Sequence, residues 1–244
     1  MRGENRAVLH GDVGRMAYGP ALELQRRLHA LRRHNVIPDV LLTLEHEPVI
    51  TLGRGARAEH VLASSQELQR LGVEVFPSER GGDVTYHGPG QLVMYPILDL
   101  KALGLDVHGY VENLEEVMIR TARAFGVPAY RKPGFPGAWT SQGKIGAVGI
   151  HVKGWVTLHG LAFNVDLTLN GFALIVPCGL QGVEAVALAD LAGRPISILE
   201  ATEQALRAFA EVFEVELVPV AGEVIRQWSS PSPSGSRCTS TPAS

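Results

Sequence analysis

The sequence is poor in cysteine, with only Cys178 and Cys238 among its 244 residues. Cys238 lies in a terminal segment rich in serine, proline and threonine, residues 229–244, which we expect to be a disordered tail. One cysteine in the folded part argues against a disulfide framework. The N-terminus also lacks the continuous apolar core of a signal peptide. Both absences favour a protein of the reducing cytoplasm.

Long apolar runs and an excess of one charge are missing as well. The longest apolar stretch, "FALIVPCGL" at 172–180, is about half the ~20 residues that a membrane-spanning helix needs. A net charge of −3 gives no basic footprint for nucleic acid. H-x-x-x-H, C-x-x-C, G-x-S-x-G, Walker and G-x-G-x-x-G patterns do not occur. These absences argue against a hydrolytic metal site, a serine hydrolase and a common nucleotide-binding loop.

What is present is the composition of a globular protein, 45% hydrophobic and 19% charged. Apolar spacing predicts helices over 20–34, from Ser64 to Gly72, after Asp106 and after Ser197. Alternating or apolar runs predict strands over 39–46, 48–53 and 91–100, and a hairpin of 144–152 with 155–165 turning at Lys153-Gly154. On the second arm of this hairpin, Thr157, His159, Leu161 and Phe163 should share one face. The fold class is α/β: a mixed sheet flanked by helices, in one domain over residues 1–228.

The segment "RGGDVTYHGPGQLVMYP", residues 80–96, concentrates glycine just before an apolar strand. Glycine permits unusual backbone dihedrals and lets a ligand approach the main chain. Within the loop Arg80 could hold an anion, Tyr86 could wall a slot, and His87 could hydrogen-bond a carbonyl. The alternative is a purely structural loop with two turns.

Two further residues are candidates for chemistry. Cys178 follows the apolar, strand-like run 172–176 and lies between Pro177 and Gly179, which predicts a thiol in a turn at a strand end. A thiol near neutral pH needs a neighbouring cation or base, and Lys144, His87, His151 and His159 could supply one. A buried structural cysteine and a solvated lysine are the alternatives, and spacing alone does not place the two residues together.

Four motifs together decide between these readings: "RGGDVTYHGPGQLVMYP", "KIGAVGIHV", "TLHGLAFNV" and "PCG" occur in the order and spacing of the octanoyltransferases of lipoic acid biosynthesis. The resemblance covers roughly residues 15–220. Phe163 stands where the family usually has leucine, and Gly146 where alanine is common, and neither bears a reactive group. The resemblance implies an α/β fold shared with the biotin and lipoate protein ligases.

The resemblance also implies roles for individual residues. Cys178 matches the cysteine that accepts the acyl group, and Lys144 matches the lysine that lowers the thiol pKa and relays protons. His159 is a further residue that could position the substrate. The segments that match the substrate-binding residues of the family are Arg80, Gly81, Gly82, Asp83, Val84, Thr85, Tyr86, His87, Ala147, Val148, Gly149, Gly160, Leu161 and Ala162.

The implied reaction takes an octanoyl group from octanoyl-acyl carrier protein to the cysteine, and then to a lysine of a lipoyl domain. Lipoyl domains occur in 2-oxoacid dehydrogenase subunits and in the glycine cleavage H protein. No cofactor, ATP or metal is expected, because a thioester already carries an activated acyl group. An ATP-dependent lipoate or biotin ligase, a lipoyl amidotransferase and a non-catalytic carrier-binding module remain as alternatives.

Overall fold

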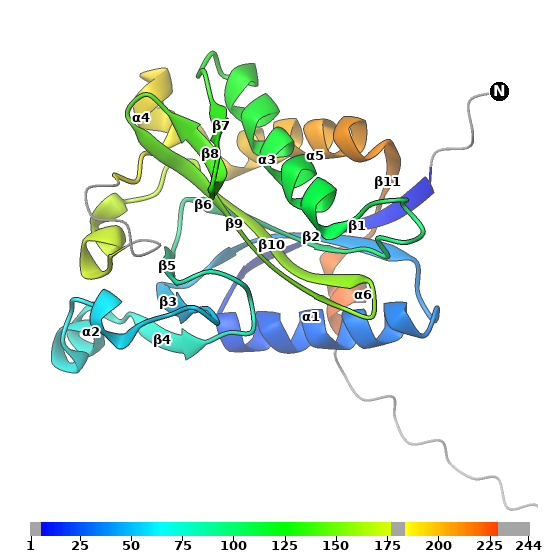
Figure 1. Cartoon of the computed structure of the whole chain (residues 1–244), viewed down its shortest axis with the longest axis horizontal. Helices are drawn as coiled ribbons and strands as arrows, with labels where there is room; N and C mark the ends of the chain where they lie inside the picture. Colours follow the sequence, from blue (N-terminus) through cyan, green and yellow to red (C-terminus); the bar gives the residue numbers. More distant parts are fainter. Residues whose placement is uncertain (1–5, 177–183, 229–244) are drawn as a thin grey trace, which may run out of the picture.

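An eight-stranded mixed β-sheet runs through the molecule, in the order β11-β1-β2-β6-β10-β9-β8-β7 (Figure 1). The structure, a computed structural model, describes residues 6–176 and 184–228. β1 pairs in parallel with both β11 and β2, and the remaining neighbours are antiparallel. The strands are β1 (Arg6–Met16), β2 (Asp39–His46), β6 (Gln91–Ile97), β7 (Tyr130–Lys132), β8 (Phe135–Thr140), β9 (Gly143–Lys153), β10 (Val156–Asn164) and β11 (Val215–Pro219).

A smaller three-stranded sheet, in the order β4-β3-β5, stands beside the large one. It is made of β3 (Val49–Leu52), β4 (Glu74–Pro77) and β5 (Val84–His87). The short elements around it are the 3₁₀ helix η1 (Ala58–His60), α2 (Ser65–Leu71) and the 3₁₀ helix η2 (Leu169–Leu174). Because β5 leads directly into β6, the glycine-rich segment 80–96 joins the two sheets.

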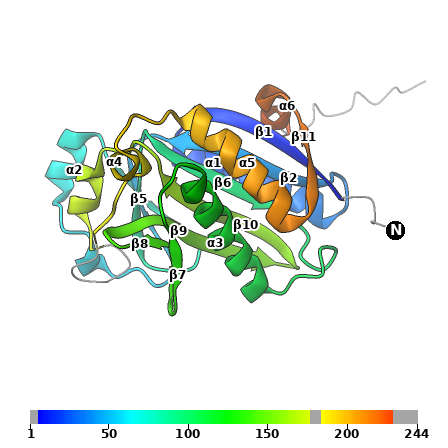
Figure 2. The same ribbon diagram turned by 90° about the horizontal axis from the view of Figure 1, so that it is seen from above.

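Helices cover both faces of the large sheet. α3 (Val107–Ala124) and α5 (Ile198–Phe213) lie side by side on one face, and Figure 2 shows them crossing above the strands. α1 (Tyr18–Arg33) covers the opposite face, where α6 (Gly222–Gln227) packs against β1. The second described range begins at Glu184 and leads into the short α4 (Leu188–Ala192). The helix-covered mixed sheet confirms the predicted fold class.

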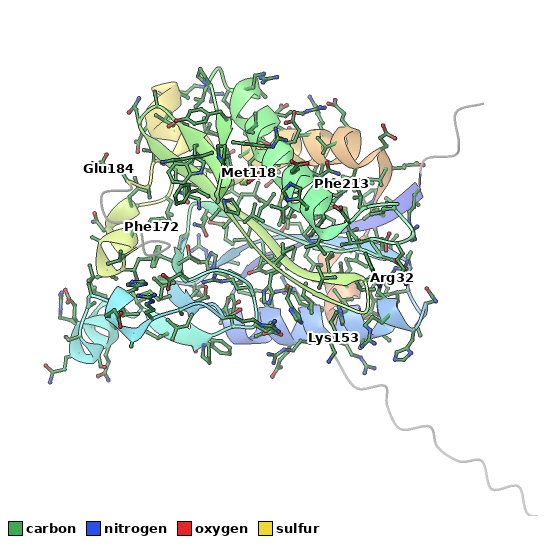
Figure 3. The ribbon with its side chains drawn as sticks, viewed as in Figure 1. Arg32, Met118, Lys153, Phe172, Glu184 and Phe213 are labelled. Carbon is green, nitrogen blue, oxygen red and sulfur yellow. The ribbon has the colours of Figure 1, made fainter. Side chains whose placement is uncertain are left out.

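Two hydrophobic cores correspond to these two faces. The core under α3 and α5 includes Met118 and Phe213, which Figure 3 labels on that side of the sheet. The core under α1 includes Leu24, Leu28 and the β6 residues Val93 and Tyr95. Burial of these apolar side chains is the main force that holds the helices on the sheet, at roughly 25 cal/mol per Å² of apolar surface.

Local signals in the sequence explain the element boundaries. The Ser64 hydroxyl accepts a hydrogen bond from the backbone N–H of Glu67, and Gly72 ends α2 in a left-handed conformation. The Asp106 carboxylate caps α3 by accepting from the Gly109 N–H. The hairpin of β9 and β10 turns through Gly154 and Trp155, both with positive φ, directly after the predicted Lys153.

One predicted strand is wrong. The run before Cys178 forms the 3₁₀ helix η2, and only Ile175 makes an isolated bridge, with Val61. The apolar side chains of this run pack as one face of a helix against the small sheet, in a cluster with Tyr86 and Leu167. Cys178, Cys238 and the predicted tail 229–244 lie outside the described residues.

Candidate active site

A cavity lies between the β9–β10 hairpin and the glycine-rich segment that follows β4. Its empty volume is about 520 Å³, with the open solvent at its mouth included. Three stretches that are distant in the sequence line it: residues 80–85 with His87, residues 147–149 of β9, and residues 159–162 of β10. Tyr18 at the start of α1 and Tyr95 of β6 complete the lining. Every predicted binding residue except Tyr86 therefore lines one cavity.

Close approach of backbones shapes this cavity. Gly149 faces Gly160 across the hairpin, so neither strand projects a side chain there. A Cβ at Gly149 would lie 3.1 Å from Arg80 Cδ, and one at Gly160 would lie 2.2 Å from the Met94 carbonyl oxygen. The Gly81 N–H donates to the Ile150 carbonyl over 2.8 Å, which fixes the loop above the strand. No side chain fits at Gly160, and one at Gly149 would have to displace the Arg80 side chain.

Arg80 is a structural member of the site. Its guanidinium is buried and donates from Nη2 to the carbonyl of Thr51 over 2.7 Å and to Oγ1 over 2.8 Å. Nη1 also donates to the Gly81 carbonyl. These bonds tie the loop to β3 and hold its backbone in place. These bonds occupy much of the hydrogen-bonding capacity of the guanidinium, which was predicted to hold an anion.

Tyr86 has a different role from the one predicted. Its ring packs edge-on against Phe172, with 5.7 Å between ring centroids. It also fills the space above Gly171, where a Cβ would lie 2.2 Å from ring atoms. Alternation along β5 explains this, because Val84 and Tyr86 point into the cluster of the small sheet. Tyr86 thus supports η2 rather than walling the slot.

His87 is held in one tautomer by a chain of side-chain amides. Asn164 Nδ2 donates to the Val186 carbonyl, so its oxygen accepts from Gln91 Nε2 over 3.0 Å. Gln91 Oε1 then faces His87 Nδ1 over 2.7 Å. Because this chain ends on a backbone carbonyl, Nδ1 carries the proton and Nε2 carries the lone pair. Burial holds the pKa of His87 well below 6.5, so the ring is neutral.

In this tautomer His87 already donates its N–H to the side-chain carbonyl of Gln91, which leaves only the Nε2 lone pair for another group. A neutral imidazole that donates from Nδ1 can only accept at Nε2. His46 is fixed in the same way: its Nδ1 bonds the Met16 carbonyl, and its Nε2 accepts from the Tyr95 hydroxyl over 2.7 Å. Burial lowers the pKa of His46 to about 4. These two buried histidines are therefore polar but uncharged.

His159 lies at the cavity on an unusual backbone, with φ of 61°. Leu158 and Ala162 pack in the core under α1, and Leu161 and Phe163 pack in the core under α3. Simple alternation would put His159 on the face of Leu161 and Phe163, as predicted, and that face is covered by α3. The left-handed backbone instead turns its ring toward Tyr95, Glu79 and α1. For a residue with a Cβ this conformation costs about 1–2 kcal/mol.

Lys144 lies at the mouth side of the cavity. It lines an adjoining cavity that shares Gly81, Gly82, Asp83, Val148 and Gly149 with the first. Its Nζ lies 5.3 Å from the centre of the Trp139 ring. Gly137 leaves room for its stem, because a Cβ there would lie 2.7 Å from Lys144 Cε. The end of the Lys144 side chain therefore lies along β8, in the cavity that adjoins the first one.

The chain on both sides of Cys178 is anchored near this mouth. The Val176 N–H donates to the His60 carbonyl over 2.8 Å. On the other side, the Lys144 N–H donates to the Glu184 carbonyl over 2.9 Å, and the Val186 N–H donates to the Lys144 carbonyl over 3.1 Å. Figure 3 shows Glu184 at the opposite end of the molecule from Arg32 and Lys153. The predicted pairing of Cys178 with Lys144 falls outside the described residues.

Comparison with known proteins gives the family. The description "Lipoyl protein ligase A/B catalytic domain" matches residues 17–210. The octanoyltransferase of Solibacter usitatus is 46% identical over 210 residues, which is 86% of this chain and 94% of that protein. The chain belongs to the octanoyltransferase family. The octanoyltransferase of Gloeobacter violaceus is 47% identical over 213 residues, 87% of this chain and 93% of that protein. The resemblance read from the four motifs is confirmed.

Solved structures of lipoate protein ligases have the same fold as this octanoyltransferase family member. A bipartite lipoate protein ligase from Thermoplasma acidophilum aligns with a TM-score of 0.70 at 15% identity, covering 92% of this chain and 91% of that chain. A lipoate-protein ligase A with bound ATP aligns with a TM-score of 0.69 at 15% identity, covering 93% and 97%. These likenesses confirm the predicted lipoate-ligase fold.

Sequence reasoning missed the contribution of Tyr18, Tyr95 and the amide pair Gln91–Asn164. Tyr18 is the first residue of α1, and its position in the helical pattern does not distinguish it from a core residue. Gln91 and Asn164 begin and end strands that pair with each other, with Gln91 opposite Asn164. Two amides in facing strand positions would have been a detectable signal once the pairing was known.

Proposed function

We propose that this octanoyltransferase family member moves an octanoyl group from octanoyl-acyl carrier protein to Cys178, and from Cys178 to a lysine of a lipoyl domain. Family membership supports the activity. The observation that carries the proposal is the cavity itself, in which residues 80–85 and His87 meet residues 147–149 and 160–162, next to the cavity of Lys144. Its apolar walls and glycine backbones suit an acyl chain whose carbonyl is its only polar group.

In the first step, the Cys178 thiolate attacks the carbonyl carbon of the donor thioester. A tetrahedral oxyanion forms and collapses, breaking the bond to the carrier sulfur. The carrier leaves as a thiolate and takes up a proton. One thioester replaces another, so the step is close to isoenergetic and requires no ATP. Splitting the transfer in two is the usual logic of covalent catalysis.

In the second step, the amine of the lipoyl-domain lysine attacks the acyl-enzyme. Lys144 in its neutral form removes a proton from the attacking nitrogen, and the C–S bond to Cys178 breaks. The products are an amide, a thiolate and a protonated Lys144. As an ammonium, Lys144 then favours the Cys178 thiolate for the next cycle. The amide is more stable than the thioester, which makes this step the driving one.

The anchored chain supports the placement of Cys178 in this scheme. Cys178 is two residues beyond Val176 and six before Glu184, whose carbonyl accepts from the Lys144 N–H. A chain spans at most about 3.5 Å per residue. Two residues reach about 7 Å and six reach about 21 Å, so the chain lengths on both sides are compatible with the proposed attack by Cys178 at this cavity.

Further elements of the proposal follow from the same chemistry. The partners are an octanoyl-acyl carrier protein and lipoyl domains of 2-oxoacid dehydrogenase subunits or of the glycine cleavage H protein. Neither ATP nor a metal takes part. We place the protein in the cytoplasm and assign residues 1–228 to one catalytic domain. Among the described residues, no helix is long and apolar enough to cross a bilayer.

An ATP-dependent ligase is the second candidate, because a structural neighbour with this fold is a lipoate-protein ligase A with bound ATP. Identity separates the two: 46% to the octanoyltransferase of Solibacter usitatus against 15% to that ligase. A non-catalytic carrier-binding module is the third candidate. It would form no covalent adduct at all.

Intact-protein mass spectrometry tests the proposal directly. The chain incubated with octanoyl-acyl carrier protein, without ATP, should gain the mass of one octanoyl group, and hydroxylamine should remove it. Peptide mapping should place the adduct on Cys178, and Cys178→Ser should show no thioester. Adding a lipoyl domain should discharge the enzyme and load the domain. Loading that requires free octanoate and ATP would instead identify a ligase, and a Cys178→Ser variant with wild-type turnover would refute the nucleophile.

A further inference from the structure

Lys144 stands beside Trp139 because of an irregularity in the sheet. β8 and β9 pair regularly through Ala138, which stands opposite Gly146. At the next residue the register shifts, so that Trp139 stands opposite Lys144 and Ile145 has no partner on β8. An extra residue in one strand re-aims the side chain next to it, and such bulges are frequent beside active sites. Because directly opposite residues share a face of the sheet, the shift brings the lysine side chain to the indole.

The stem of Lys144 runs along β8 toward this indole. Its Cε lies close to Gly137, where an added Cβ would be 2.7 Å away. From there Nζ reaches a point 5.3 Å from the centre of the Trp139 ring. This lies within the distance of about 6 Å at which the negative face of an aromatic ring attracts an ammonium, and tryptophan attracts most strongly. Gly137 therefore makes room for the lysine, and Trp139 offers a contact to its charged end.

The indole of Trp139 is fixed independently of Lys144. It is 4% exposed, and its Nε1 donates to the Phe135 carbonyl over 2.9 Å. The Phe135 ring packs edge-on against it, with 6.3 Å between ring centroids and 73° between ring planes. A buried ring whose one polar atom is paired has little freedom to turn. The flexible stem of the lysine thus meets a rigid partner.

Two features distinguish this contact from general packing of the sheet edge. The main chain of Lys144 is held by Glu184 and Val186 through the bonds described above, so the strand does not need the indole to stay in place. Lys132 on β7 also lies over the ring, with its Nζ 4.6 Å from the ring centre. An apolar side chain of similar size would fill the same space without attracting either ammonium. The electrostatics of the ring face, rather than its volume, is what two lysines share.

We propose that Trp139 is a positioning residue for acyl transfer, because the face of its indole holds the Lys144 ammonium in the cavity that adjoins the acyl site. The inference rests on the proposed function. A lysine side chain without such a contact samples many rotamers, and ordering it costs conformational entropy at each transfer. The attraction acts on the charged form of Lys144. It therefore bears chiefly on the first step, in which the ammonium favours the thiolate.

Single-turnover loading from octanoyl-acyl carrier protein tests the inference. Trp139→Leu removes the ring face, and Trp139→Phe keeps a weaker one. The matched control is Trp155→Leu, because Trp155 also carries an ammonium over its ring, with the Lys101 Nζ 5.2 Å from the centre, but lies at the turn between β9 and β10. Thermal unfolding verifies that each variant is folded, and rates are taken per folded molecule.

We expect Trp139→Leu to slow loading by about tenfold to 100-fold, the usual cost of misplacing a catalytic group. Trp139→Phe should keep most of the rate, and Trp155→Leu should leave it unchanged. In a Lys144→Ala background, Trp139→Leu should slow loading no further, because no ammonium remains to be positioned. Equal slowing in both backgrounds, or a loss of stability alone, overturns the inference. Failure of the wild type to form any octanoyl adduct would instead refute the proposed function.

Fluorination of the ring tests the same point without changing its shape, and it serves also if Trp139→Leu does not fold. Tryptophans with increasing numbers of ring fluorines are incorporated at position 139 alone. Each added fluorine withdraws negative charge from the ring face and so weakens its attraction for a cation. Loading should slow stepwise along the series while the melting temperature changes little. A loading rate that does not depend on fluorination overturns the assignment.

A third measurement needs no activity. Reductive methylation with isotope-labelled formaldehyde marks the lysine amino groups, and a methyl group above an aromatic face gives an NMR signal upfield of the others. The Lys144 signal, identified by its absence in Lys144→Arg, should be shifted upfield in the wild type. In Trp139→Leu it should return to the position of exposed lysines. A Lys144 signal at that ordinary position in the wild type overturns the inference even where octanoyl transfer is confirmed.

Discussion

The two faces of the large sheet are buried in different ways. Under α3 and α5 the core is apolar and rich in aromatic contacts, such as the stacked pair Phe209 and Phe213, with 4.3 Å between ring centroids. On the side of α1, the end of the sheet next to β5 buries His46, His87 and His159 together with two tyrosines. One face therefore supplies stability, while the other carries polar groups that cost stability and shape a cavity.

This difference between the faces predicts which property, stability or activity, a substitution on each face should change. A residue under α3 and α5 contributes through packing, so its loss should lower stability and leave the chemistry of the folded molecules unchanged. A residue around the cavity contributes to binding or catalysis, so its loss should lower activity by more than any change in stability explains. The following experiments test this contrast between the two faces, beginning with the largest expected effect.

Phe209→Ala tests the apolar face. Phe209 is fully buried between α3, the sheet and Phe213. Removing its ring leaves a cavity in the core and should lower the free energy of unfolding by about 3–5 kcal/mol. Urea unfolding followed by circular dichroism measures this loss. Octanoyl loading per folded molecule should stay at the wild-type level, and a large loss of specific activity would contradict the division between the faces.

Lys144→Ala tests the mouth of the cavity. Because Lys144 is partly exposed and its backbone bonds to Glu184 and Val186 do not need the side chain, stability should change by less than about 0.5 kcal/mol. Acyl transfer should slow by about 100-fold or more, the usual contribution of a general acid–base group.

Single-turnover loading of the variant from octanoyl-acyl carrier protein measures this effect. The matched control is Lys153→Ala, because Lys153 is exposed at the far tip of the same hairpin. Equal rates for both variants would remove Lys144 from the mechanism.

The sequence was sufficient for much of this arrangement, and the failures have physical causes. Helices with caps at Ser64, Asp106 and Ser197 were predicted because capping is a local signal. The motif residues were assembled only through a family resemblance, since spacing cannot place β5 beside the β9–β10 hairpin. The face of His159 was predicted wrongly because alternation assumes an extended backbone, and its positive φ is not encoded by residue type.

The strand predicted before Cys178 was also wrong, and for a different reason. Short apolar segments have the same composition in strands and in buried helical turns, so periodicity does not separate them. This run forms the 3₁₀ helix η2 because Gly171 and Phe172 pack against Tyr86 in the folded protein. The tautomer of His87 was also beyond reach, because it depends on Asn164 and Val186, which lie far along the chain.

Asn164→Leu tests the amide chain that fixes His87. The substitution leaves Gln91 Nε2 and the Val186 carbonyl each without the bond that Asn164 made. Leaving buried polar groups unpaired should cost about 1–3 kcal/mol of unfolding free energy. Because the chain also orients His87, octanoyl loading should slow beyond what stability explains. Asn170→Leu is the control, since Asn170 is exposed on η2.

Histidine ionisation gives an effect that appears only on acidification and separates the faces by pH. His46 has a pKa lowered to about 4 by burial, against 6.5 when exposed. The unfolded chain therefore binds more protons between these values. Its contribution to stability is complete above pH 6.5 and is lost as the pH falls toward 4, at up to about 1.4 kcal/mol per pH unit. His87 and His159, with pKa values lowered in the same direction, steepen the loss.

The slope of unfolding free energy between pH 6.5 and 4.5 measures this contribution. His46→Gln removes one titrating group while an amide can still serve Met16 and Tyr95, so the slope should fall by the share of one histidine. His108→Gln, at an exposed position at the start of α3, should leave the slope unchanged. If both variants keep the wild-type slope, acid sensitivity arises elsewhere and the neutral buried His46 is not its cause.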